Sequence, residues 1–151
     1  MVKVPNFSST QSQYSAPEQS KIPSPDELNY LYSAELLDIN NLGLSGRTST
    51  TFFGGSFTIY TKILNLKDPD RGKQYIGWLV KRDPNGSLTY FKVGAAYKNS
   101  DNYVNIFQGG TDITHYRQYV LSVESDENVT IPSNKITEAY LIKTENNQSK
   151  N

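Results

Sequence analysis

The stretch from Gln74 to Ala96 reads QYIGWLVKRDPNGSLTYFKVGAA, and it decides the fold class. In its first half Ile76, Trp78 and Val80 recur at every second position, which places them on one face of an extended strand. The motif Asp83-Pro-Asn-Gly follows, with proline at the second turn position and glycine at the fourth. After this turn the alternation resumes. The stretch therefore predicts a β-hairpin.

Short β-rich runs separated by turn residues continue on both sides of this hairpin. The most regular is Ser56 to Leu64, in which Phe57, Ile59 and Ile63 share one face. Helical spacing is not sustained anywhere. The predicted strands span residues 30–39, 44–53, 56–64, 74–82, 88–96, 103–107, 115–125 and 136–142. Seven or eight strands at this spacing predict an all-β protein folded as an antiparallel β-sandwich, with a small barrel as the alternative.

The same alternation predicts the core of the sandwich. We expect Ile76, Trp78, Phe91, Tyr119 and Leu121 to lie between the two sheets, because each occupies the apolar face of its strand. Trp78 is the only tryptophan and has apolar neighbours in mid-strand. A position under the opposite sheet is therefore predicted for it, rather than an exposed stacking platform.

Composition excludes several classes of function. Fifteen basic residues balance fifteen acidic ones, so no net field attracts nucleic acid. The chain has one histidine and no cysteine, which removes the commonest ligands of zinc, iron–sulfur clusters and haem. Acidic and amide side chains gather in turns, but none matches the spacing of a calcium loop. We therefore expect no metal, no cofactor and no nucleic-acid partner.

The domain organisation is predicted as an arm, a folded domain and a tail. Residues 1–28 combine prolines with few large apolar residues and are expected to form a disordered arm or tether. The β-sandwich is expected over residues 29–143, and a disordered tail over residues 144–151. An alternative is an arm donated to a neighbouring subunit. In that case Val2, Val4 and Phe7 would supply the contact.

The second half of the chain resembles a known family. Tyr75-Ile-Gly-Trp-Leu-Val, a hairpin, Tyr103-Val-Asn-Ile-Phe, then Tyr119-Val-Leu-Ser-Val-Glu and Pro132 follow one another in order. They resemble the extracytoplasmic C-terminal domain of bacterial anti-sigma-K factors and its stand-alone exported relatives. The resemblance implies an immunoglobulin-like sandwich outside the cytoplasmic membrane, with no known catalysis. It does not extend to sigma-factor binding, which in that family belongs to a cytoplasmic domain upstream of a membrane helix. The loop after Glu124 departs from the family pattern.

Location follows from this resemblance and from the absence of certain segments. No apolar run in the sequence is long enough to span a bilayer, and the first residues lack the apolar stretch of an export signal. The sequence is rich in Asn, Ser, Thr and Tyr, as in many exported bacterial surface proteins. The protein is therefore either cytosolic or exported with an export signal that is not present in this chain. Composition and the resemblance favour the second, so we expect an extracytoplasmic protein.

The tyrosines suggest a surface for binding a protein partner. Tyr outnumbers Phe and Trp together, and Tyr60, Tyr75, Tyr90, Tyr103 and Tyr116 are expected on outward faces. Such faces suit a protein partner or self-association, because Tyr offers a large contact area at low entropic cost.

The function expected from these features is a non-catalytic cell-surface binding or scaffolding domain. Two alternatives are a structural subunit of an extracellular filament, layer or particle assembled through the arm, and a hydrolase with an unrecognised site. For a hydrolase, His115 would need a nucleophile such as Ser122 and an orienting acid such as Asp112, and no nucleophile-elbow motif surrounds any Ser.

Overall fold

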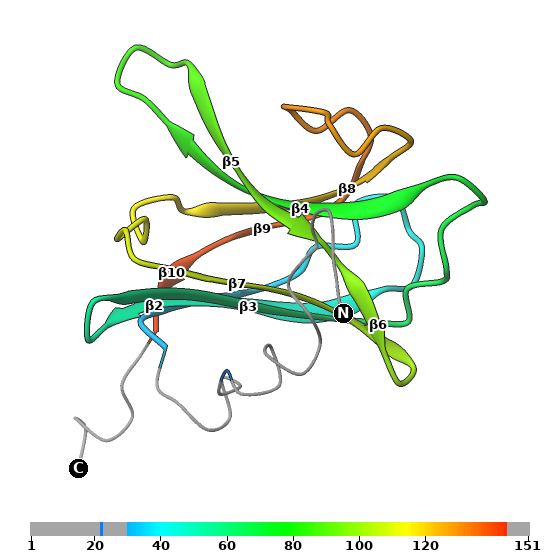
Figure 1. Ribbon diagram of the computed structural model, residues 1–151, viewed down its shortest axis with the longest axis horizontal. Coiled ribbons are helices and arrows are strands. Elements are labelled where there is room, and N and C mark those ends of the chain that lie inside the picture. Colours follow the sequence, from blue (N-terminus) through cyan, green and yellow to red (C-terminus); the bar gives the residue numbers. More distant parts are fainter. Residues whose placement is uncertain (1–21, 23–29, 145–151) are drawn as a thin grey trace, which may run out of the picture.

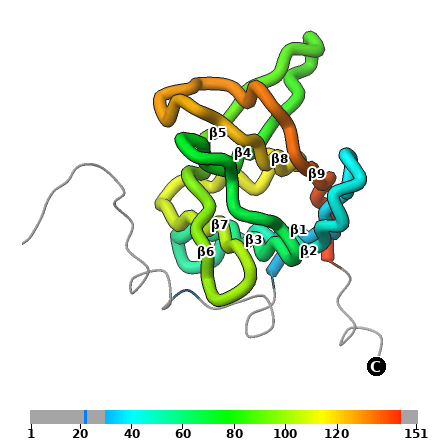
Figure 2. The backbone as a smooth tube through the Cα atoms, turned by 90° about the vertical axis from the view of Figure 1, so that its right-hand side faces the viewer, coloured from blue at the N-terminus to red at the C-terminus, as the bar shows by residue number. Residues whose placement is uncertain are grey.

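In the part of the chain that the structure describes, two antiparallel sheets pack face to face (Figure 1 and Figure 2). The computed structural model describes residue 22 and residues 30–144, and this part of the chain contains strands and no helix. It therefore contains no helix that could cross a membrane. The strands of this part are β1 (Tyr32–Glu35), β2 (Ser45–Phe53), β3 (Ser56–Leu64), β4 (Gln74–Arg82), β5 (Leu88–Ala95), β6 (Tyr97–Asn99), β7 (Asn102–Gly109), β8 (Gln118–Glu124), β9 (Lys135–Tyr140) and β10 (Ile142–Lys143). The prediction of an all-β chain in two packed antiparallel sheets is confirmed.

The chain passes repeatedly from one sheet to the other. The six-stranded sheet has the order β10-β1-β2-β3-β7-β6, and the four-stranded sheet has the order β5-β4-β8-β9. Two of the crossings take a single residue, Ala96 between β5 and β6 and Leu141 between β9 and β10. Near the first of these corners the pairing of β4 with β5 shifts register between Gly77 and Trp78, because β5 has an extra residue, Val93, at this step. Such a β-bulge bends strands where they change sheets.

The observed strands differ from the predicted ones mainly at these corners. The predicted bounds 56–64 and 74–82 are those of β3 and β4. The prediction of seven or eight strands is wrong, because β6 was not foreseen and the last predicted strand divides at Leu141 into β9 and β10. Both are short strands beyond a sheet-to-sheet corner, where two or three residues are too few to show an alternation. The predicted arm and tail lie outside the described residues, apart from Ile22 and Thr144.

The space between the sheets is filled by one large apolar cluster. Tyr119 and Leu121 of β8 are fully buried in it, as predicted, and they face Phe57 and Ile59 of β3. Phe91 packs against the cluster with its ring centroid 5.1 Å from that of Phe107, in an edge-to-face arrangement. This cluster is the main core.

Ile76 and Trp78 do not belong to this core, which corrects the prediction. Both are buried, but they form a second cluster with Val80 and Val120 on the outer face of the four-stranded sheet. The inward positions of β4 are taken instead by Tyr75 and Leu79, members of the main core. Both faces of β4 are apolar, so the alternation grouped the residues correctly without showing which group points inward.

A loop of ten residues, 125–134, covers this outer cluster (orange in Figure 1). Val129 packs on the cluster, and Lys92 donates a 2.9 Å hydrogen bond to the carbonyl of Glu127 while its Nζ lies 5.5 Å from the centre of the Trp78 ring. The Trp78 indole donates to Ser122 Oγ at 2.9 Å, so its one polar atom is satisfied. The loop therefore turns the outside of the sheet into a second apolar interior.

Candidate binding site at one end of the sandwich

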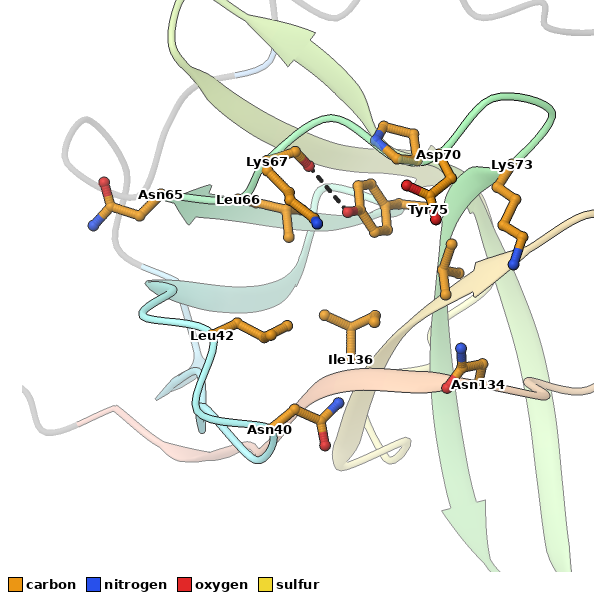
Figure 3. Close-up of a pocket in the computed structure, with 12 residues that line it drawn as sticks. Asn40, Leu42, Asn65, Leu66, Lys67, Asp70, Lys73, Tyr75, Asn134 and Ile136 are labelled. Carbon is orange, nitrogen blue, oxygen red and sulfur yellow. Dashed lines mark hydrogen bonds between the residues drawn. The ribbon is translucent and has the colours of Figure 1, made fainter.

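A pocket of about 410 Å³ opens at one end of the sandwich (Figure 3). It lies where the β1–β2 connection, the β3–β4 connection and the start of β9 come together. Its lining consists of apolar, amide and charged side chains: Asn40, Leu42, Asn65, Leu66, Lys67, Pro69, Asp70, Lys73, Tyr75, Val123, Asn134 and Ile136. Binding loops carried on a rigid sandwich are a common arrangement for recognition.

The floor of the pocket is continuous with the main core. Leu66, Tyr75 and Ile136 are buried members of that core, and Val123 packs against it. The Tyr75 hydroxyl donates to the backbone carbonyl of Lys67 at 3.0 Å, and its ring meets the Tyr103 ring edge-on at 5.6 Å. Burial raises the pKa of Tyr75, and the nearby Asp70 adds to this, so the phenol stays protonated at neutral pH. The floor is therefore rigid and apolar.

The β3–β4 connection forms one wall, and Asp68 anchors it from behind. One carboxylate oxygen of Asp68 accepts a 2.7 Å hydrogen bond from the Tyr103 hydroxyl and contacts Lys98 Nζ at 3.0 Å. These two donors lower the pKa of Asp68, and burial together with the same hydrogen bond raises the pKa of Tyr103 to about 12. At neutral pH the pair is thus a carboxylate and a neutral phenol, the state that holds the wall in position.

The β1–β2 connection forms the opposite wall and is held by a second aspartate. Asp38 accepts hydrogen bonds from the backbone N–H groups of Leu42 at 2.8 Å and Gly43 at 2.7 Å. This closes the loop and presents Leu42 toward Ile136, as Figure 3 shows. Asn40 on the same loop donates to the carbonyl of Lys135 at 3.1 Å, which ties the wall to β9.

The rim is polar and exposed. Asn40 and Asn134 lie on one side of Ile136, Lys73 extends toward Asn134, and Asp70 lies beside Tyr75 (Figure 3). Amides both donate and accept hydrogen bonds, and the two lysines and one aspartate of the lining leave an excess of one positive charge. No Ser, Thr, Cys or His is among the described residues that line the pocket. The arrangement offers hydrogen bonds above an apolar floor, which is the chemistry of binding.

The five tyrosines predicted as a partner surface do not share one face. Tyr75 and Tyr103 are buried in the main core, which corrects their expected outward position. Tyr60 is half-buried on the outer side of the six-stranded sheet. Tyr90 packs on the outer cluster around Trp78. Tyr116 packs at the edge of the main core, with Lys81 Nζ over its ring. Tyr75 nevertheless belongs to the candidate site. The predicted arm contacts Val2, Val4 and Phe7 lie outside the described residues.

The rim was not foreseen from the sequence. Its amides come from three separate connections, and each one reads as an ordinary turn residue. One signal was present. Asn41 and Asn65, in the two walls, have positive φ angles of 55° and 63°, a conformation that Asn tolerates better than most residues. The asparagines therefore indicated where the turns lie, but not that these turns meet at one end of the sandwich.

The structure does not bring together the three residues considered for a hydrolase, His115, Ser122 and Asp112. Ser122 is fully buried and accepts the hydrogen bond from Trp78, whereas His115 is exposed and lies beside Tyr116. Asp112 accepts hydrogen bonds from the backbone N–H and the hydroxyl of Thr114. These residues therefore serve local structure.

The acidic turns are likewise occupied by protein partners. Asp68 is held by Tyr103 and Lys98, and Asp83 accepts a 2.8 Å hydrogen bond from Thr89 and lies 3.4 Å from Lys81. Over residue 22 and residues 30–144, no three His, Cys, Asp or Glu side chains converge in a way that would hold a metal ion. The expected absence of metal stays a prediction.

A second cavity, of about 470 Å³, has a basic lining that includes Lys81, Arg82, Arg117 and Lys135. Each of these cations is already engaged. Lys135 pairs with Glu138 at 2.8 Å, Arg82 donates to the carbonyl of Gly86, and the Arg117 guanidinium lies 3.9 Å from the centre of the Tyr32 ring. We therefore take the end pocket as the candidate site.

Comparison with known proteins found no family model, no curated protein and no solved structure that matches this chain.

Proposed function

We propose that this protein is a non-catalytic binding domain of the exported, cell-surface type, and that the end pocket is its ligand site. The observation that carries the proposal is the construction of the pocket. Two loops, each anchored by a buttressing aspartate, hold exposed amide and charged groups around a rigid apolar floor. Preorganised polar groups over an apolar surface are the usual features of a small-ligand site.

The strand order supports an immunoglobulin-like assignment within this proposal. Strands β2-β3-β7-β6 facing β5-β4-β8-β9 correspond in order to A-B-E-D facing C′-C-F-G of immunoglobulin sandwiches, with β1 and β10 as additions. The β3–β4 and β8–β9 connections then correspond to the B–C and F–G loops, which bind antigen in variable domains. The end pocket is lined by residues of the first of these connections and by Asn134 at the end of the second.

We propose a small, neutral, polyhydroxylated ligand, such as a saccharide unit, for this pocket. A hydroxyl both donates and accepts a hydrogen bond, as does an amide, so the Asn40 and Asn134 side chains are suited to it. The rim carries charges of both signs, Lys67 and Lys73 against Asp70, which disfavours a strongly charged ligand of either sign. The apolar floor suits the C–H face of a sugar ring.

Titration calorimetry against a panel of oligosaccharides, with peptides as a comparison panel, tests the proposal. We expect a saccharide to bind and the double variant Lys73→Ala/Asn134→Ala to weaken binding by at least about tenfold, the effect of losing about 1.4 kcal/mol. Asn99→Ala, which removes an exposed amide from β6, is the matched control and should bind normally. Binding that survives the double variant would refute this pocket as the site.

The exported location rests on the composition and on the resemblance of β4, β7 and β8 to the anti-sigma-K extracytoplasmic domain. Fractionation of the native host with an antibody to this protein tests it. The protein should be recovered outside the cytoplasm, and recovery in the cytoplasm would reject the proposed location.

A further inference from the structure

The basic cavity lies at the opposite end of β4 from the end pocket. Tyr75 at the start of β4 lines the end pocket, whereas Lys81 and Arg82 at the end of this strand line the cavity of about 470 Å³. The two hollows share no lining residue. Of the nine described residues that line the basic cavity, five are lysine, arginine or histidine and none is aspartate or glutamate. The cavity is therefore a separate feature with a chemistry of its own.

Carboxylates neutralise only two of the four lysines and arginines of this cavity. Lys81 Nζ lies 3.4 Å from Asp83, and Lys135 Nζ lies 2.8 Å from Glu138. The two arginines form no ion pair with any carboxylate of the described residues. Four cations and two carboxylates leave an excess of two positive charges. Like charges gathered in one hollow repel one another, so a bound anion would relieve this repulsion.

Neutral groups hold both arginines in place. Arg82 Nη1 donates to the carbonyl of Gly86 at 3.1 Å. Arg117 Nε donates to the carbonyl of Thr114 at 3.0 Å, and its guanidinium carbon lies 3.9 Å from the centre of the Tyr32 ring. A guanidinium carries five N–H donors, so one hydrogen bond leaves most of them to a ligand. These contacts therefore orient the two guanidinium groups without cancelling their charge.

The rest of the lining offers apolar surface and a hydroxyl. Leu88 and Tyr140 are 40% and 55% exposed. Gln118 Nε2 donates to the Tyr140 hydroxyl oxygen at 3.5 Å, which leaves the phenol hydrogen available to an acceptor in the cavity. A volume of about 470 Å³ lies in the range of small-molecule sites and exceeds the needs of a single inorganic ion. The cavity thus has room for an organic group beside an anionic one.

We propose that this cavity binds a small phosphomonoester. At neutral pH such a group carries close to two negative charges, which matches the excess of two positive charges in the cavity. Its oxygens accept charge-assisted hydrogen bonds from Arg82 and Arg117, which are stronger than hydrogen bonds between neutral groups. The organic part of the ligand lies against Leu88 and Tyr140.

NMR titration of the full chain with glucose 6-phosphate tests this site, with inorganic phosphate and sulfate as parallel arms. All arms have the same ionic strength, so the screening of surface charges is constant. We expect saturable shifts of the backbone signals of Arg82, Arg117 and Gln118, and tighter binding of glucose 6-phosphate than of either inorganic ion. Shifts that do not saturate overturn the proposal. Equal affinity for the three probes also overturns it, because the organic part would then make no contact.

Charge-removing variants show whether the two arginines hold the phosphate. Arg82→Gln/Arg117→Gln should weaken the binding of glucose 6-phosphate at least about tenfold, because two charge-assisted hydrogen bonds are lost. Lys62→Gln/Arg71→Gln is the matched control, since it removes two exposed positive charges that line neither hollow, and it should bind normally. Binding that survives Arg82→Gln/Arg117→Gln, or that falls equally in the control, overturns the proposal.

Two further variants keep the result independent of folding and of the saccharide site. Arg82→Gln alone preserves the contact of Arg117 with Tyr32 and should also weaken binding, should the double variant fail to fold. Unchanged binding in a folded Arg82→Gln overturns the role of this arginine. Lys73→Ala/Asn134→Ala, in the end pocket, should bind glucose 6-phosphate normally, so a failure of the saccharide proposal does not affect this test. Loss of phosphate binding in Lys73→Ala/Asn134→Ala would place the anion in the end pocket and overturn the proposal.

Discussion

The two apolar clusters of this protein exclude water by different means. The main core lies between two sheets and contains a buried polar network: Tyr119 donates to Asn105 Oδ1 at 2.7 Å, and Asn105 donates to the carbonyl of Gly94 at 3.0 Å. The outer cluster around Trp78 has a sheet on one side only, and a single loop covers the other. The main core thus depends on the fit of two rigid layers, and the outer cluster depends on one loop staying closed.

That loop is anchored by a carboxylate. Ser133 donates its backbone N–H and its hydroxyl to the two oxygens of Glu124, at 2.8 and 2.5 Å. Glu124 is buried at the end of β8, so its charge is stabilised by these hydrogen bonds rather than by water. The comparison teaches that burial alone does not identify the interior of this sandwich. Four substitutions separate the two clusters, in order of decreasing effect.

Gly77→Ala should have the largest effect, because it disrupts the fit of the two sheets. A Cβ atom at Gly77 would lie 1.6 Å from Asn105 Oδ1 and 2.8 Å from the Tyr119 hydroxyl, so the polar network would have to break or the sheets separate. We expect a loss of roughly 4 kcal/mol or more in the free energy of unfolding, measured by chemical denaturation. Gly110→Ala is the control, because its Cβ would meet no atom within 4 Å. A similar stability of the two variants would contradict the tight approach at Gly77.

Trp78→Ala tests whether the outer cluster behaves as a true interior. The side chain is 1% exposed, so its removal should cost about 3 to 5 kcal/mol, as for an aromatic residue in a core. Tyr140→Ala is the matched control, since this aromatic residue lies in β9 of the same sheet but is 55% exposed. Its loss should cost well under half as much. Equal costs in denaturation experiments would show that the loop does not close over Trp78.

Tyr119→Phe removes one hydroxyl from the main core and leaves its ring in place. Asn105 Oδ1 would then be buried without its donor, which should cost about 1 to 3 kcal/mol. Thermal unfolding measures the difference, and the double variant Tyr119→Phe/Asn105→Leu separates the loss of a partner from the loss of packing. A fully neutral single variant would mean that the network adds no stability.

Acidification should open the outer cluster before the main core. Burial alone would raise the pKa of Glu124, but hydrogen bonds from Ser122 and Ser133 outweigh it and lower the pKa. Stability from this group is therefore present above the pKa of an unfolded Glu and is lost as the pH falls through the lower, folded pKa. Because Trp78 is the only tryptophan, its fluorescence reports on the outer cluster specifically.

Glu124→Gln isolates this contribution. Three other carboxyl groups have lowered pKa values, so their protonation also destabilises the fold as the pH falls: Asp68, Asp83 and Asp112. The relevant quantity is therefore the difference in stability between the wild-type protein and Glu124→Gln at each pH. Stability at neutral pH should fall in the variant, and its fluorescence should depend less on pH. Parallel acid transitions in both proteins would show that Glu124 does not hold the loop.

Local patterns determined much of this protein. The alternation in β3 and β4 and the Asp83-Pro-Asn-Gly turn predicted the strands and their hairpin, because strand and turn preferences act between residues close in the chain. Tyr119 and Leu121 were placed in the core for the same reason. The candidate pocket was not foreseen, since Asn40, Lys73 and Asn134 meet only through the packing of three distant connections.

The sequence by itself determined that the chain forms antiparallel strands, and which side chains share a face of each strand, because both follow from the two-residue period of an extended backbone. Tertiary structure alone decided which face of β4 points inward. Both sides of β4 belong to apolar clusters, with Tyr75 and Leu79 on one and Ile76, Trp78 and Val80 on the other, so hydrophobicity alone does not show which side points inward. In the folded protein the inward side is the one that carries Gly77, where the missing side chain leaves room for Asn105 and Tyr119 to meet between the sheets. The loop anchored by Glu124 covers Trp78 on the other side.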